Sequence, residues 1–299
     1  MKEIVRSKYS QIARESSSCC GVGSECGTFS PTDEYKNLPG YVSDADLSLG
    51  CGIPQKDAAI RPGDTVVDLG SGAGNDAFTA AKLVTETGRV VGVDFSHDMI
   101  DRAHRNREKI AAKNVDFIYG DIEDLPLREN FADVVISNCV LNLVPDKSKA
   151  FREIERVLKP GGHFAISDIV LEGEIPEELK SSVAAYTGCV SGAVQKTEYL
   201  EKLKDAGFEQ ISIAKQRKIE IPRDILDSFL NGRSLPDVTI LSVTVTGHKS
   251  AVNSSAPEAS KTAGSSERGN SPISKGSGKL ASLGIETEGG ACCGSDCCN

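Results

Sequence analysis

Residues 66–76 read "VVDLGSGAGND", and this stretch decides the fold. It begins as a short apolar run and continues into three glycines at alternate positions, Gly70, Gly72 and Gly74. Glycine lets the backbone turn tightly and approach a bound ligand, so the stretch predicts a strand, a ligand-binding loop and a helix. The spacing departs from the dinucleotide pattern G-x-G-x-x-G, and a plain strand-to-helix turn is the alternative.

Further apolar runs are spaced along the chain. The expected strands are residues 64–70, 89–95, 115–121, 131–138, 163–170, 209–216 and 238–247. The central runs are nearly continuous in apolar residues and alternate with helical stretches, as when helices cover both faces of a parallel sheet. In the last run Val243 and Val245 alternate with Thr244 and Thr246, which predicts a half-buried strand at the sheet edge. We therefore expect an α/β, Rossmann-like, mainly parallel seven-stranded sheet.

Composition excludes several classes of partner. The formal charge is −9, from 34 basic and 43 acidic residues, which argues against nucleic acid and anionic membranes. No stretch approaches the roughly 20 apolar residues of a membrane span. The first residues, "MKEIVRSKYSQIARES", lack the apolar core of a secretory signal, so we expect a cytoplasmic protein.

Four regions are expected along the 299 residues. Residues 1–60 form an N-terminal cap with a Cys-rich segment, and residues 61–170 form the Rossmann-like core. Residues 171–249 complete the sheet and bind the substrate. Residues 250–299 are rich in Ser, Gly, Ala and Lys, which predicts a flexible tail, and this tail ends in a Cys cluster.

Ten cysteines are unusual for a cytoplasmic chain, where disulfides are rare and clustered thiols more often bind metals or carry out redox chemistry. The clusters at the two ends comprise Cys19, Cys20, Cys26, Cys292, Cys293, Cys297 and Cys298. Adjacent cysteines seldom serve one tetrahedral zinc ion, and a reducing compartment opposes a permanent disulfide. The C-terminal cluster is either incidental or a tethered set of thiols for a thiol-binding species.

Three acidic or apolar positions follow the second and third predicted strands. Asp94 closes the second strand at the distance where a carboxylate binds ribose hydroxyls. Asp121 and Ile122 follow the third strand, so they fall at the same carboxyl edge of the sheet. With the glycine loop, these residues outline a crevice shaped for a nucleoside.

The segments "VDLGSGAG", "VDFS", "GDIEDLP" and "RVLKPGG" resemble the successive motifs of class I S-adenosylmethionine-dependent methyltransferases, over about residues 61–170. The resemblance implies that S-adenosylmethionine is the cofactor. It places Gly70, Gly72 and Asn138 near the methionine part, Asp94 at the ribose, and Asp121 with Ile122 at the adenine. The implied cofactor set also contains Asp68, Ser71 and Met99. Asp68 has an alternative role as a strand-end carboxylate that orders the glycine loop.

Three further cysteines flank the core. Cys139 follows a predicted core strand, where cysteine is usually a small buried hydrophobe. Cys51 and Cys189 lie in Gly-flanked segments outside the sheet, where packing gives little reason for a thiol. Converging thiolates form a site for soft ions, and these isolated cysteines lack the local pairs typical of zinc.

The segments "YKNLPGYVSDADLSLGCGIP", "DLGSGAGNDAF", "ISNCVLNLVPDK" and "YTGCVSGA" closely resemble arsenite methyltransferases, from about residue 35 to residue 249. The resemblance implies that Cys51 and Cys189 bind As(III), with arsenite and methylarsenite as substrates. It implies that an N-terminal cysteine, taken here as Cys20, pairs with Cys51 in a redox relay that thioredoxin or glutathione resets. Many family members carry one more cysteine in the last strand, and Val243 is expected at that position. We expect a monomer.

Two other functions remain open. Another small-molecule methyltransferase, such as a quinone-type enzyme, would share the cofactor motifs, and a base such as His163 or Asp168 near the pocket would favour it. A non-catalytic As(III)-sequestering protein would need only the thiols. The four histidines, His97, His104, His163 and His248, are expected to be solvated.

Overall fold

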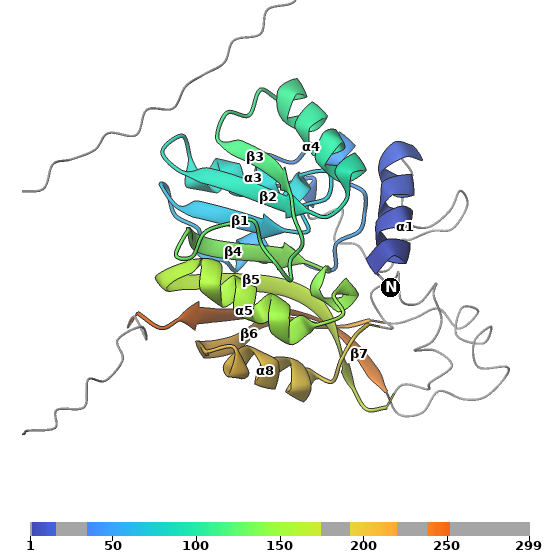
Figure 1. The fold of residues 1–299 in the computed structure, drawn as a ribbon, viewed down its shortest axis with the longest axis vertical. Helices are drawn as coiled ribbons and strands as arrows, with labels where there is room; N and C mark the ends of the chain where they lie inside the picture. The colour runs from blue at the N-terminus through green and yellow to red at the C-terminus, as the bar shows by residue number, and fades with distance from the viewer. Residues whose placement is uncertain (1, 16–34, 175–191, 220–237, 252–299) are drawn as a thin grey trace, which may run out of the picture. The chain divides into compact units, whose positions relative to one another are not determined.

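The computed structural model describes residues 2–15, 35–174, 192–219 and 238–251, and these form a seven-stranded sheet with helices packed on it (Figure 1). The strand order is β3-β2-β1-β4-β5-β7-β6. The strands are β1 Thr65–Leu69, β2 Arg89–Asp94, β3 Val115–Tyr119, β4 Ala132–Asn138, β5 Leu158–Glu172, β6 Phe208–Ile219 and β7 Thr239–Lys249. The first five strands run parallel to one another, and β7 is antiparallel to both β5 and β6. The predicted fold class is confirmed.

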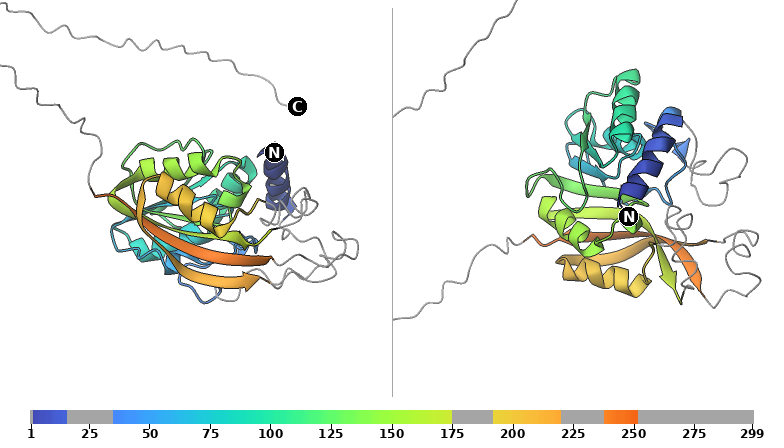
Figure 2. Two further views of the ribbon diagram at one scale, coloured as in Figure 1. Left: turned by 90° about the horizontal axis from the view of Figure 1, so that it is seen from below. Right: turned by 45° about the vertical axis from the view of Figure 1, so that its right-hand side comes forward.

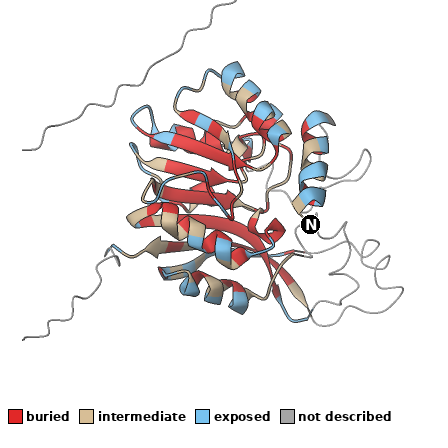
Figure 3. Ribbon diagram, in the orientation of Figure 1, coloured by how far each residue is buried: buried red, intermediate tan, exposed pale blue. Residues whose placement is uncertain are grey.

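The helices cover both faces of the sheet, as the two further views show (Figure 2). They are α1 Lys2–Glu15, α3 Asn75–Val84, α4 His97–Lys109, α5 Lys147–Val157 and α8 Lys196–Asp205, with three short 3-10 turns at Ser43–Ala45, Pro54–Lys56 and Leu141–Leu143. Apolar residues of α3 and α4 pack with one face, and those of α5 and α8 pack with the other. The strands β1, β2, β4, β5 and β7 are mostly buried, whereas most residues of the edge strand β6 are exposed (Figure 3).

The strand β7 corrects one prediction. It lies between β5 and β6 rather than at the edge, and the edges of the sheet are β3 and β6. Alternation of Val and Thr reports which face of a strand is apolar but not how many neighbours the strand has. Thr244 is buried because its hydroxyl is hydrogen-bonded to Ser167 Oγ at 2.9 Å.

Helix α1 lies beyond the carboxyl ends of β1, β2 and β3 (Figure 1). Lys2 at its start forms ion pairs with Asp121 and Glu123. Arg14 near its end makes two 2.9 Å hydrogen bonds to Asp98 at the beginning of α4. The helix is therefore attached at one end to the loop after β3 and at the other end to the first turn of α4.

None of the described helices is long and apolar enough to cross a membrane. Residues 1–255 cluster into one compact unit, and the second unit, residues 256–299, lies outside the described residues. The predicted tail therefore stays a prediction.

Candidate functional site

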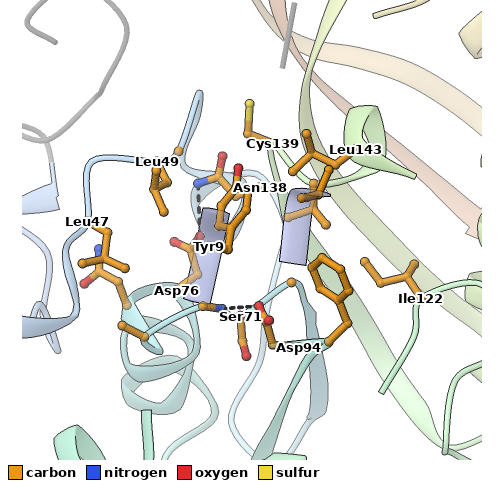
Figure 4. A pocket seen from close by; sticks show the side chains of 18 of the residues that line it. Tyr9, Leu47, Leu49, Ser71, Asp76, Asp94, Ile122, Asn138, Cys139 and Leu143 are labelled. Carbon is orange, nitrogen blue, oxygen red and sulfur yellow. Dashed lines mark hydrogen bonds between the residues drawn. The ribbon is translucent and has the colours of Figure 1, made fainter. Parts of the chain in front are cut away.

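A cleft opens at the carboxyl edge of the sheet, between the ends of β1, β2 and β4 and helix α1 (Figure 4). It encloses about 1100 Å³ of empty space, open to solvent on one side, which is sufficient for a nucleoside-sized ligand. Its wall comes from the glycine loop, the ends of β2 and β4, residues 45–50, and Lys2, Val5 and Tyr9 of α1. The predicted crevice thus exists, and α1 contributes a wall that sequence patterns did not reveal.

The glycine loop has a backbone that side chains would strain. Gly70, Gly72 and Gly74 have φ values of 68°, 50° and 101°, all in the left-handed region. A Cβ at Gly70 would overlap the side chain of Val140. The amide of Gly72 donates a 2.9 Å hydrogen bond to Asp94 Oδ2. The loop and the second strand are therefore joined directly at the cleft.

Asp94 is buried at the cleft, with the second carboxylate oxygen accepting a 2.9 Å hydrogen bond from Ser96 N. Burial raises the pKa of Asp94 to about 6, although backbone hydrogen bonds oppose that shift. A buried carboxylate held by backbone amides is rigid, and this position at the end of the second strand suits recognition of ribose hydroxyls.

The cleft holds unpaired acceptors. Asp68 Oδ2, Ser71 Oγ and Asn75 Oδ1 are buried and have no hydrogen-bond partner among the described residues. Ser71 and Asn75 line the cleft itself. Buried polar atoms are rarely left unsatisfied, so this wall fits a ligand that supplies donors.

The cleft is acidic. Its lining carboxylates are Asp46, Asp76, Asp94 and Asp121, and Lys2 is the only basic side chain that the structure places among the lining residues. A bound cation would be attracted to these carboxylates.

The predicted adenine positions, Asp121 and Ile122, both line the cleft. Lys2 Nζ donates to Asp121 Oδ2 at 2.6 Å. Burial raises the pKa of Asp121, but the hydrogen bonds from Lys2 and the Glu123 backbone and the charges of Lys2 and Lys149 together outweigh it, and the pKa lies below its ordinary value. Met99 is different, because the structure places it fully buried in the core under α4 and not on the cleft wall.

Two thiols lie close to one another in the fold beyond Asn138. Cys51 and Cys139 are 5% and 7% exposed and belong to one apolar cluster with Leu143 and Ile169. Cys139 also lines the cleft beside Asn138 (Figure 4). Interpreting Cys139 as a small buried residue is correct for its burial but misses its place on the cleft wall. Outside the described residues lie Cys19, Cys20, Cys26, Cys189, Cys292, Cys293, Cys297 and Cys298.

Val243 stands where many family members are expected to carry a further cysteine. Val243 packs with Leu241 and Val245 in the core on the α5 and α8 side of the sheet. The neighbouring Ser242 faces the other side, where its Oγ donates a 2.7 Å hydrogen bond to Cys51 O. Successive side chains of a strand point to opposite faces, so a cysteine at position 243 would point away from Cys51.

Three polar residues at the cleft were not predicted: Tyr35, Gln55 and Asp76. Asp76 accepts hydrogen bonds from Tyr35 Oη at 2.5 Å and Gln55 Nε2 at 3.0 Å. For Asp76, the sequence offered one signal, an acidic residue in the first helical turn after the glycine loop. Such a residue is ordinarily explained by its favourable interaction with the helix dipole. No sequence pattern pointed to Tyr35 or Gln55.

The predicted alternative bases do not line the cleft. Asp168 is fully buried and accepts a 3.3 Å hydrogen bond from Tyr199 Oη. His163 Nε2 lies 2.6 Å from Ala58 O, and its ring is 5.3 Å from that of His248. His97 stacks on Tyr119 with ring centroids 4.0 Å apart. The histidines are therefore more engaged with neighbours than solvation alone predicts.

Comparison with known proteins gives consistent matches. A family model described as a methyltransferase domain matches residues 60–207. The chain is 41% identical over 245 residues to an arsenite methyltransferase from Halobacterium salinarum, covering 77% of this chain and 61% of that protein. It is 32% identical over 233 residues to an arsenite methyltransferase from Aquipseudomonas alcaligenes, covering 74% of this chain and 66% of that protein. The chain therefore spans less than two thirds of each of these relatives.

A solved structure is covered over a larger share of its own length than these two relatives are. The crystal structure of an arsenic(III) S-adenosylmethionine methyltransferase from Chlamydomonas reinhardtii superposes with a TM-score of 0.62. The two chains are 31% identical, and the match covers 73% of each.

Proposed function

Because this chain belongs to the arsenite methyltransferase family of S-adenosylmethionine-dependent enzymes, we propose that it methylates As(III) held by its thiols. The observation that carries the proposal is the position of Cys51 and Cys139 in one apolar cluster directly beyond an acidic, nucleoside-sized cleft. A cofactor cleft alone would fit many methyltransferases, whereas two buried thiols beside it favour a soft substrate.

The cleft residues fit S-adenosylmethionine. Asp94 would bind the ribose hydroxyls, and Asp121 with Ile122 would face the adenine. The unpaired oxygens of Ser71 and Asn75 would accept hydrogen bonds from the ammonium group, whereas the buried Asp68 is not among the residues that line the cleft. When bound, S-adenosylmethionine supplies an electrophilic methyl group on positively charged sulfur to the lone pair of arsenic.

The thiols hold the substrate in this proposal. Thiolates are preferred ligands of soft ions, and the apolar side chains around Cys51 and Cys139 keep water away from the arsenic. Cys189, the other predicted ligand, completes a set of three. Val243 stands where many family members carry a further cysteine, and in this proposal Cys139 supplies the third thiol instead.

The redox steps belong to the same proposal. Methyl transfer raises the formal oxidation state of arsenic, and a dithiol that becomes a disulfide returns it to As(III). Cys20 paired with Cys51 is the proposed dithiol, with thioredoxin or glutathione as the external reductant. A second cycle would act on methylarsenite, in a monomeric cytoplasmic enzyme.

The decisive experiment incubates the full chain with arsenite, S-adenosylmethionine and a thiol reductant and identifies the arsenic products. We expect methylated arsenic from the wild type and at least a hundredfold less from Cys51→Ser and from Cys139→Ser. Both variants should still be stabilised by S-adenosylmethionine in a thermal melt, since a ligand that binds only the folded state raises Tm. Undiminished turnover in both variants would contradict the assignment of the thiols.

The same assay separates the alternatives. A sequestering protein would bind arsenite without releasing methylated product, and S-adenosylmethionine would not raise its Tm. A quinone-type methyltransferase would bind the cofactor and leave arsenite unmethylated.

A further inference from the structure

The side chain of Asn138 is hydrogen-bonded to the backbone of Cys51 and Gly52. Asn138 Oδ1 accepts hydrogen bonds from Cys51 N at 3.0 Å and Gly52 N at 3.2 Å. Asn138 Nδ2 donates to Gly52 O at 2.9 Å. A flipped amide would place its NH2 group against two N–H donors, so these contacts determine the orientation of the side chain.

The two glycines around Cys51 allow this close approach. A Cβ at Gly50 would lie 2.6 Å from Asn138 Nδ2. A Cβ at Gly52 would overlap the side chain of Ser167 on β5. The segment therefore lies directly against Asn138 and the sheet, and Cys51 O is bound by Ser242 Oγ from β7.

Asn138 is itself held by a second layer of polar groups. Asn138 Nδ2 lies 2.8 Å from Tyr35 Oη. It also lies 3.1 Å from Asp76 Oδ2 (Figure 4). Tyr35 Oη donates to Asp76 Oδ1 at 2.5 Å, and Gln55 Nε2 donates to the same oxygen at 3.0 Å. Hydrogen bonds to a carboxylate are stronger than those between neutral groups, so Asp76 is the anchor of this network.

The network connects two parts of the site. Asp76 belongs to the first turn of α3, directly after the glycine loop. Cys51 lies in the segment whose backbone is hydrogen-bonded to Asn138 at the other end of the network. A polar chain of this kind loses much of its effect when one member is removed, because the remaining groups stay buried without partners.

We propose that Tyr35 and Asp76 are positioning residues, which hold Asn138 so that it keeps the Cys51 main chain in place to present its thiol to arsenic. The inference rests on the proposed function, since it names residues that act on the As(III) site through Asn138. It assigns Asn138 to the thiol segment, beyond the cofactor role that family resemblance implies.

The first test compares Tyr35→Phe with Tyr199→Phe. Both substitutions remove one hydroxyl that is bonded to a buried or half-buried aspartate, but Tyr199 belongs to the core on the α5 and α8 side and its hydroxyl bonds Asp168 instead of Asp76. Burial raises the pKa of Tyr199, and Cys51 and Cys139 are near enough to add to that rise. This variant therefore controls for the loss of a nearby tyrosine hydroxyl outside the Asn138 network. We expect Tyr35→Phe to raise the KM for arsenite about tenfold and leave the Kd for S-adenosylmethionine within twofold of the wild type. Tyr199→Phe should leave both constants within twofold, whatever its effect on Tm.

The second test asks whether Tyr35 acts through Asn138. Tyr35 Oη also donates to Gly52 O at 3.0 Å, so part of its effect reaches the Cys51 segment directly. In an Asn138→Ala background, Tyr35→Phe should therefore raise the arsenite KM by about threefold rather than tenfold, because the residue that transmits most of its effect is gone. If Asn138→Ala fails to fold, the same double-mutant cycle is measured with Asp76→Asn, which keeps the side-chain volume, in place of Asn138→Ala. Additive effects in both cycles would overturn the proposal and leave Tyr35 with a packing role only.

A third readout does not require turnover. Alkylation of Cys51 by iodoacetamide, followed at the level of its peptide by mass spectrometry without arsenite or cofactor, should change at least threefold in Tyr35→Phe and Asp76→Asn but not in Tyr199→Phe. An unchanged rate in both variants would overturn the positioning role. If the wild type labels as expected but forms no methylated arsenic, the proposed function fails while the network stands.

Discussion

The sheet carries a buried tyrosine–aspartate pair on each of its faces, and the two pairs differ in what surrounds them. On the cleft side, Tyr35 and Asp76 are 2.5 Å apart and share contacts with Gln55 and Asn138. On the other side, Tyr199 and Asp168 are 3.3 Å apart, and the Tyr199 ring packs edge-to-face on Phe151. Both pairs join a tyrosine hydroxyl to a carboxylate. The residues around each pair therefore decide whether it supports the thiol segment or the core.

The two aspartates both have raised pKa values, and different groups oppose the rise in each. Burial raises the pKa of Asp168 to about 7. Burial also raises the pKa of Asp76, but hydrogen bonds from Tyr35, Asn138 and Gln55 act against that shift. The rise of the Asp168 pKa is likewise opposed, by the charge of Lys147 and by hydrogen bonds from Tyr199 and from backbone groups. The two carboxylates therefore differ in the identity of the groups that favour their charged form, which are side chains around the thiol segment for Asp76.

Removing each carboxylate should separate the two pairs most widely. We expect Asp76→Ala to lower kcat/KM for arsenite about a hundredfold, because it leaves Tyr35, Gln55 and Asn138 without their common acceptor. Asp168→Ala should keep kcat/KM within threefold but lower the free energy of unfolding by about 1–3 kcal/mol, the cost of an unsatisfied buried hydroxyl. Kinetics and urea denaturation of both variants measure these quantities. Equal loss of activity in two folded variants would end the comparison.

The pH dependence of stability should distinguish the core pair next. The folded-state pKa of Asp168 is about 7, above its ordinary value of 3.8, so the folded state holds this proton more tightly than the unfolded state does. The unfolding free energy therefore falls as pH rises from about 4 to about 7 and levels off above that. Asp168→Asn should remove about 2 kcal/mol of the decline between about pH 5.5 and pH 8. A wild-type-like decline in denaturation curves of the variant would show that Asp168 does not titrate in this range.

A methyl group at position 50 should disturb the cleft pair alone. In Gly50→Ala the new Cβ meets Asn138 Nδ2, and we expect about a tenfold rise in the arsenite KM with little change in cofactor affinity. The matched control is Gly50→Ala combined with Asn138→Ala, in which the overlap is relieved. If the methyl group is equally harmful in both backgrounds, Asn138 is not what it strikes.

The smallest effect is expected at helix α1. The ion pair of Lys2 with Asp121 is partly exposed, with side chains 38% and 44% accessible, and such pairs contribute little. Lys2→Ala should change the Kd for S-adenosylmethionine two- to threefold, measured by calorimetry at low salt, and the difference should shrink at high salt. Arg6→Ala on the same helix is the control, because Arg6 pairs weakly with Glu3 and does not line the cleft.

Sequence patterns predicted the parts of the site that depend on short segments. The glycine loop, Asp94, Asp121 and Ile122 each follow a strand directly, and parallel strands bring such positions to one edge. The Tyr35–Asn138 contact joins residues 103 positions apart, and no local pattern reports such a pair. The facing of Val243 depends on strand register, which pairing with β5 determines and alternation of residue types does not.

The acidic lining of the cleft has a consequence for the end of each catalytic cycle. S-adenosylmethionine carries a positive charge on sulfur, and donation of its methyl group leaves a neutral thioether. The positive charge on the cofactor sulfur, which the carboxylates of Asp46, Asp76 and Asp94 attract, is then gone. Spent cofactor should therefore leave more readily than fresh cofactor, and product inhibition should be correspondingly weak.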